Sequence, residues 1–90
     1  MNIRELQSRL LPTVGEGKIF DAVTKVSHWI KKIKDEKEYT AQNDKEIEII
    51  TKFAELGIVK LERKGNSVVA TLTEPGKKLH RDFVARGYYL

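Results

Sequence analysis

The sequence predicts one α+β domain over residues 1–90 that is mainly α-helical. The first observation is a run of apolar residues spaced alternately by four and three, which marks the buried face of a long helix. These residues are Ile19, Val23, Val26, Ile30 and Ile33. The second is a pair of segments rich in strand-forming residues, 58–63 and 67–72, separated by Lys64-Gly65-Asn66, a combination typical of a β-hairpin.

The elements before the hairpin begin with two helices. Residues 2–11 carry apolar side chains at helical spacing, namely Ile3, Leu6, Leu10 and Leu11. Pro12 and the glycine-containing residues 15–17 are expected to break the chain. The long helix is expected over about 17–37, and its lysine-rich end suits the negative pole of the helix dipole. Residues 38–40 follow as a short extended segment.

A third helix is expected at about residues 43–57. Asn43 or Asp44 is placed to cap its first turn by accepting a hydrogen bond from an unpaired backbone N–H. Gly57 is expected to end it, because glycine readily takes the left-handed conformation of a helix C-cap.

After the hairpin, Thr73 is expected to cap a C-terminal helix at about 74–87. The resulting order is helix, long helix, short extended segment, helix, hairpin, helix. This is the order of a winged helix-turn-helix domain with terminal helices. Residues 43–57 would be the recognition helix, and residues 58–72 would form a two- or three-stranded wing sheet.

Two stretches resemble small prokaryotic winged-helix regulators of the MarR and PadR groups. Residues 53–63 contain the Leu-Gly-Ile-Val turn into the first wing strand, and residues 71–79 contain Leu-Thr-Glu-Pro-Gly at the start of the last helix. The resemblance covers roughly residues 43–82. One departure is that no separate helix precedes the recognition helix. Either the long helix is broken near Asp35, or the middle helix is reduced to a turn.

The positive charge is concentrated near the C-terminus. The chain has a net charge of +4, and residues 58–90, with seven basic and three acidic side chains, account for the whole surplus. Such asymmetry indicates either a polyanionic partner, usually nucleic acid, or a solubilising surface.

The resemblance implies that the start of the recognition helix and the tip of the wing contact double-stranded DNA. Asn and Gln side chains can bond adenine edges, and Lys can reach guanine or phosphate. Wing cations would bind phosphates without reading sequence. The candidates are Gln42, Asn43, Lys45, Thr51 and Lys52 on the helix, and Arg63, Lys64 and Asn66 on the wing. The alternatives are a solvated helix face, which the carboxylates on this helix favour, and an ordinary polar hairpin tip.

Other basic residues have less defined roles. Lys31, Lys32, Lys34 and Lys37 alternate with carboxylates and are interpreted as a solvated helix end. Lys77, Lys78 and Arg81 would either contact flanking phosphates or remain exposed.

The terminal helices are expected to form a homodimer interface, as they often do in the family that the sequence resembles. A 90-residue domain offers little room to bury both of their apolar stripes. The expected interface residues are Ile3, Leu6, Leu10 and Phe83. A dimer would suit a pseudo-palindromic DNA site with half-sites one helical turn apart.

No catalytic centre, metal site or cofactor is expected. The chain has no cysteine and only two histidines, and residues 15–17 lack the Lys-Ser/Thr of a phosphate-binding loop. No apolar run is long enough to span a bilayer, and no signal peptide is recognisable, so a cytoplasmic, nucleoid-associated protein is expected. The abundance of Lys and Glu is compatible with a thermophilic source.

The leading hypothesis is therefore a dimeric, sequence-specific transcriptional regulator rather than an enzyme. Two alternatives remain open. One is a plasmid-partition or chromatin-type protein that spreads along DNA. The other is a winged-helix protein–protein interaction module.

Overall fold

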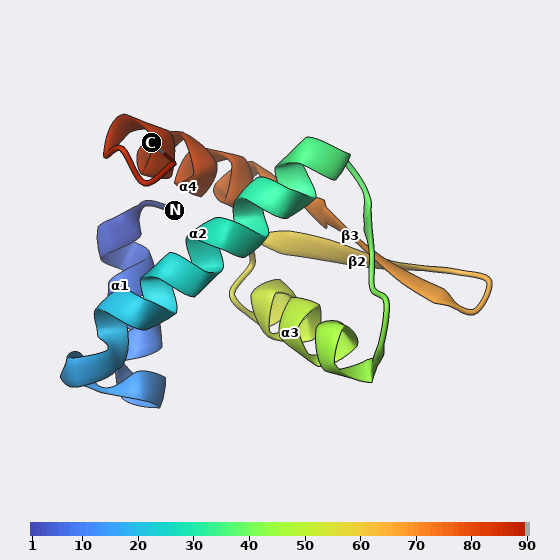
Figure 1. The fold of residues 1–90 in the computed structure, drawn as a ribbon, viewed down its shortest axis with the longest axis horizontal. Coiled ribbons are helices and arrows are strands. Elements are labelled where there is room, and N and C mark those ends of the chain that lie inside the picture. Colours follow the sequence, from blue (N-terminus) through green and yellow to red (C-terminus); the bar gives the residue numbers. More distant parts are fainter. Residues whose placement is uncertain (90) are drawn as a thin grey trace.

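Helix α2 (Ile19–Glu36) crosses the middle of the molecule, and the other elements pack around it (Figure 1). The computed structural model describes residues 1–89. Before α2 come α1 (Ile3–Val14) and a short 3-10 turn (Glu16–Lys18). After it come β1 (Tyr39–Thr40), α3 (Asp44–Glu55), β2 (Val59–Lys64), β3 (Ser67–Leu72) and α4 (Glu74–Ala85). The domain is α+β and mainly helical, as the sequence predicts.

The core forms on the apolar face of α2 that the spacing predicts. Four of its five predicted residues are buried, namely Val23, Val26, Ile30 and Ile33. Helix α3 adds Ile50 and Phe53, and β2 and β3 add Val59 and Ala70. The remaining side of the core is supplied by α1 and α4.

This arrangement corrects the role given to three residues of the expected dimer interface. Ile3, Leu6 and Phe83 have at most 1% of their surface exposed within a single chain, and Leu10 is half-buried. The terminal helices bury their apolar stripes against α2 and each other, so these side chains are core residues. The backbone N–H of Ile3 reinforces the contact by donating to the Asp82 carboxylate at 2.6 Å.

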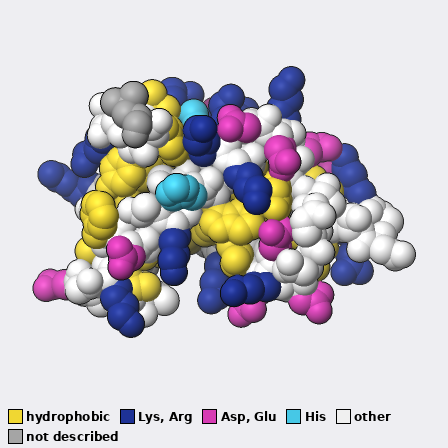
Figure 2. Space-filling view, in the orientation of Figure 1, with side chains coloured by type: hydrophobic (Ala, Val, Ile, Leu, Met, Phe, Trp, Pro, Cys, Tyr) yellow, Lys and Arg dark blue, Asp and Glu magenta, His cyan; other side chains and the backbone are white. Residues whose placement is uncertain are grey.

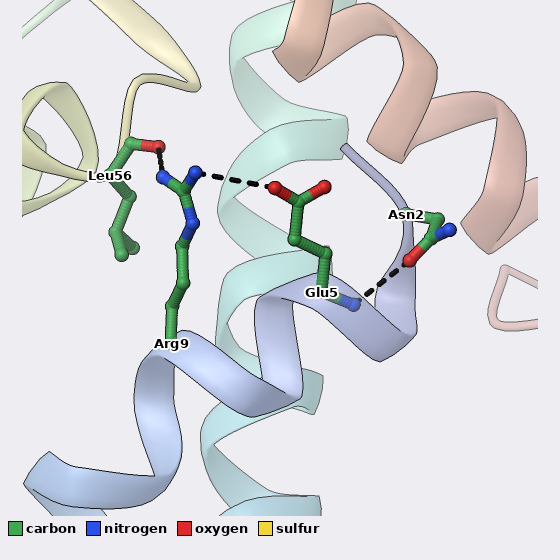
Figure 3. A network of polar contacts seen from close by, with 4 residues as sticks. All are labelled: Asn2, Glu5, Arg9 and Leu56. Atoms are coloured by element: carbon green, nitrogen blue, oxygen red, sulfur yellow. Dashed lines mark hydrogen bonds and ion pairs between the residues drawn. The ribbon is translucent and has the colours of Figure 1, made fainter.

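Helix α1 continues one turn beyond its expected end. Pro12 lies inside the helix, which closes at Gly15, where φ is +74° and the backbone N–H donates to the Leu11 carbonyl at 2.9 Å. Proline removes one backbone hydrogen bond, and the last turn tolerates that loss here. At the other end, Asn2 caps the helix by accepting from the Glu5 N–H (Figure 3).

A polar contact links α1 to the end of α3. The Arg9 guanidinium donates to the Leu56 carbonyl at 3.0 Å and pairs with the Glu5 carboxylate at 3.2 Å (Figure 3). The carbonyl groups at a helix C-terminus lack partners within the helix, so Arg9 satisfies one of them while fixing the position of α3.

The three strands form an antiparallel sheet in the order β1-β3-β2. The hairpin register runs from Val59 opposite Leu72 to Lys64 opposite Ser67, with a turn at residues 65–66. This confirms the predicted hairpin. Strand β1 is only two residues long and pairs with Val69 and Ala70, so the sheet has three strands only near its middle.

Between α2 and α3 there is no further helix. Helix α2 is continuous through Asp35, and only β1 and residues 41–43 separate its end from α3. Of the two alternatives left by the sequence, the reduced connection is the one observed.

The start of α4 lies against the backbone of Gly57 and Ile58, the two residues that precede β2. The Thr73 side chain accepts from the Gly76 N–H at 3.1 Å, as a helix cap, and donates to the Gly57 carbonyl at 2.6 Å. A Cβ atom at Gly76 would overlap the carbonyl oxygen of Ile58 and lie 3.2 Å from a Leu72 methyl group. Only glycine fits at this contact.

We therefore expect Gly76→Ala to lower the free energy of unfolding by about 2–3 kcal/mol, the usual effect of overpacking a tight site. Gly17→Ala is the matched control, because a Cβ there meets no atom within 4 Å. Urea denaturation measures both variants. Equal stability of the two would mean that α4 can move away from the Ile58 backbone at little cost.

Candidate nucleic-acid interface

The start of α3 is held together by its own polar side chains. The Asn43 side-chain oxygen accepts from the Glu46 N–H at 2.9 Å, which makes Asn43 the N-cap. In return, the Glu46 carboxylate accepts from the Gln42 N–H at 2.8 Å, a variant of the capping box. The Gln42 side-chain amide donates to the Thr40 carbonyl at 2.9 Å. Gln42 and Asn43, the residues expected to read bases, thus have structural roles, and of these only the Asn43 cap follows from the sequence.

Glu46 also joins α3 to β1 and α2. Its carboxylate accepts from the buried Tyr39 hydroxyl at 2.9 Å, and Lys32 lies 5.1 Å from the centre of the Tyr39 ring and 5.3 Å from that of Trp29. The hydrogen bond from Gln42 lowers the pKa of Glu46, and Tyr39 and Lys32 lower it further. Burial and the bond to Glu46 raise the pKa of Tyr39. These interactions of Glu46 with Gln42, Tyr39 and Lys32 favour its ionised form. No local sequence pattern reveals this group of interactions.

The exposed face of α3 carries more negative than positive charge. Its exposed residues are Asp44, Lys45, Glu48, Thr51, Lys52 and Glu55. Three carboxylates against two ammonium groups would meet the phosphates of a DNA groove unfavourably. The Thr51 hydroxyl donates to the Ile47 carbonyl at 2.6 Å. Lys45 and Lys52 are therefore the DNA-contact candidates on this helix with free donor groups among the described residues.

The hairpin tip presents a different set of groups. Lys64 pairs with the Glu38 carboxylate at 2.9 Å, and this contact raises the pKa of Lys64. Arg63 and Asn66 are exposed, and within residues 1–89 neither side chain has a hydrogen-bond or ion-pair partner. Arg63 is thus the wing candidate best placed to meet a phosphate.

The fold also brings together lysines whose role the sequence left open. A groove of about 260 Å³ lies where the end of α2, strand β3 and the first turn of α4 meet. Three lysines line it, together with Ile33, Thr71 and Leu72. Lys34 comes from α2, Lys37 directly follows that helix, and Lys77 comes from α4. Lys34 and Lys37 lie 40 or more positions from Lys77 in the sequence, so no local pattern could have grouped the three.

The junction of α2 and α4 next to this groove is electropositive. Burial lowers the pKa of His80, and the positive charge of Lys34 lowers it further; Arg81 and Lys31 act in the same direction, whereas Asp35 opposes them. The His80 ring stacks on Tyr89, with 5.4 Å between ring centres. His80 is therefore a half-buried side chain whose surroundings disfavour its protonated form.

Within residues 1–89, no group of three acidic or histidine side chains is arranged to hold a metal ion. No helix in that range is long and apolar enough to cross a membrane. No protein-family model, curated protein or solved structure matches this chain.

The N-cap role of Asn43 gives a direct test. We expect Asn43→Ala to lower the free energy of unfolding by about 1 kcal/mol, because the Glu46 N–H loses its partner. Asn43→Ser should retain nearly full stability, since serine caps equally well. Chemical denaturation distinguishes these results. An unchanged stability of Asn43→Ala would contradict the cap.

The serine variant also separates capping from base recognition. A residue that reads adenine needs both the oxygen and the amide of its side chain, which serine lacks. If Asn43→Ser lost specific DNA binding by tenfold or more while keeping its stability, Asn43 would be a base-reading residue as well as a cap.

Proposed function

We propose that this protein binds double-stranded DNA as a winged helix-turn-helix transcriptional regulator. The observation that carries the proposal is the β2–β3 hairpin, which extends past the helices on one side of the molecule (Figure 1). At its tip are Arg63 and Asn66, both exposed. A basic side chain on an extended hairpin can reach a phosphate or a groove without unfolding anything else.

The order of elements supports the same proposal. Helix α2, β1, α3 and the β2–β3 hairpin follow one another as in a winged helix, and α3 passes through Gly57 directly into β2. A separate helix between β1 and α3 is missing, which leaves α3 as the helix to enter the major groove. Because its exposed face is net acidic, we assign most of the affinity to the hairpin. The part of α3 that approaches bases is the side with Lys45 and Lys52.

The proposal includes a homodimer, which would require a surface other than the buried Ile3, Leu6 and Phe83. Leu11 and Phe20 are 39% and 69% exposed, and lie at the corner between α1 and α2. Leu11 and Ile19 line one shallow pocket at this corner. Two such corners meeting around a two-fold axis would bury apolar surface that a single chain leaves in water.

We expect Leu11→Glu combined with Phe20→Glu to give a monomer by light scattering. The control is Val84→Glu, since Val84 is an equally apolar residue, 54% exposed, on α4. A wild-type protein that is already monomeric at high concentration would remove the dimer from the proposal.

A protein-interaction module is the second candidate, and a specific feature favours it. Hydrophobic side chains gather in the space between α2 and α3 in the middle of one face, with charged side chains around them (Figure 2). A pocket there is lined by His28, the half-buried Trp29 and Lys32. An apolar surface with a charged rim is typical of a site for another protein.

DNA binding is tested by fluorescence anisotropy on a random duplex at two salt concentrations. We expect Arg63→Ala to weaken binding and to reduce the slope of log K against log[salt] by roughly 0.9, the contribution of one phosphate contact. Arg4→Ala is the control, because Arg4 is an exposed arginine on α1, at the opposite end of the molecule from the hairpin tip (Figure 1).

The same titration decides between the candidates. Failure of the wild-type protein to bind duplex even at low salt would exclude DNA binding and favour the interaction module. If it binds, footprinting separates the two DNA roles. A bounded protected site indicates a regulator, whereas protection that grows outward from a site indicates a partition or chromatin-type protein.

A further inference from the structure

Lys37 has a backbone conformation that L-amino acids rarely adopt. Its φ and ψ are +64° and −51°, directly after the end of α2. The Glu38 N–H donates to the Glu36 carbonyl at 2.7 Å, which closes a γ-turn around Lys37. This form of the γ-turn is rare and strained for any residue that has a Cβ atom.

The contrast with the rest of the chain makes this residue informative. In residues 1–89 there are four other positions with positive φ, and all are glycines: Gly15, Gly57, Gly65 and Gly87. A glycine would relieve the strain at position 37 as well. Backbone strain of this kind is concentrated at functional sites, where the side chain is needed for something other than stability.

The Lys37 side chain makes no contact that would explain its presence. It is exposed, and neither it nor Lys34 has a hydrogen bond or ion pair to any side chain among the described residues. The Lys37 side chain instead lines the groove at the α2–β3–α4 junction, together with Lys34 and Lys77. The γ-turn is therefore what places a third ammonium group at this groove.

The groove has the chemistry of an anion site. Three lysine side chains line a volume of about 260 Å³, and the one carboxylate paired with any of them, Glu74 on Lys77 at 3.5 Å, is itself largely exposed. Strand β1 pairs only with Val69 and Ala70, so no strand covers the edge of β3 at Thr71 and Leu72, where the groove lies. Like charges that line one groove repel one another, and an anion bound among them would offset that repulsion.

We propose that this groove binds phosphate groups, with Lys34, Lys37 and Lys77 as the binding residues. Ammonium groups bind phosphate as point charges and do not require a planar arrangement. The phosphates are those of a DNA backbone if the proposed function holds, and in that respect this inference rests on it. A free polyphosphate offers the same chemistry, so the experiment includes both.

The test uses Lys37→Gly, alone and together with Lys34→Ala. Lys37→Gly should raise the melting temperature, because glycine takes positive φ without strain. It should weaken tripolyphosphate binding, measured by calorimetry, and the double variant should nearly abolish it. On duplex DNA, the double variant should lose roughly tenfold in affinity for each missing contact near 0.1 M salt, and its salt slope should fall by about 1.8.

The matched control is Lys18→Ala with Lys25→Ala. Both are exposed lysines without an ion pair in the described part of the chain. Lys18 precedes the first residue of α2, and the 16 positions from Lys18 to Lys34 correspond to about 24 Å along the helix. The control loses the same two positive charges as the double variant but keeps all three groove lysines. It should therefore retain tripolyphosphate binding.

The outcomes distinguish this inference from DNA binding itself. Tripolyphosphate binding that depends on Lys34 and Lys37, without duplex binding by the wild type, supports the groove and rejects the proposed function. Duplex binding that the double variant leaves unchanged in affinity and salt slope, with no tripolyphosphate binding, overturns the groove and leaves the proposed function intact. A lower melting temperature for Lys37→Gly would show that Lys37 serves stability, and would also overturn the inference.

Discussion

The close contact between Gly76 in the first turn of α4 and the Ile58 carbonyl, just before β2, is the constraint on which the rest of the structure depends. The absence of a side chain lets the first turn of α4 lie directly on the Ile58 carbonyl, and Thr73 holds that turn by bonding both Gly76 and Gly57. From this fixed start, α4 runs along α2 and buries Leu79 and Phe83. The same contact sets Lys77 beside the end of α2, so one close backbone contact determines both the core and the basic groove.

Polar groups at the start of α3 show how a structural role limits a functional one. Asn43, Gln42 and Glu46 satisfy backbone groups that would otherwise lack partners at the helix end. Side chains engaged in this way are poorly suited to read bases, because a bidentate contact would first have to break the cap. The proposed DNA binding would therefore depend more on the hairpin and on lysines outside α3 than the order of elements alone implies.

Strain at Lys37 and the charge around it belong to one arrangement. Helix α2 must turn sharply to enter β1, and the chain makes that turn with a lysine where its other positive-φ positions have glycine. This conformation places the Lys37 side chain at the groove, whereas a glycine at this position would relieve the backbone strain and supply no cation. A strained residue is retained only where the surrounding structure holds it in place, and here α2 and β1 do so on either side.

The sequence by itself determined the helices, the hairpin and their order, because these depend on nearby residues. The spacing of Val23, Ile30 and Ile33, the cap at Thr73 and the turn at Gly65 act within a few positions of the chain. Only the tertiary structure decided that Ile3 and Phe83 are core residues and that Lys34, Lys37 and Lys77 share a groove. Apolar periodicity predicts which face of a helix is buried but not which element covers it. Side chains 40 or more positions apart line one groove only after packing has fixed how α2 and α4 lie relative to each other.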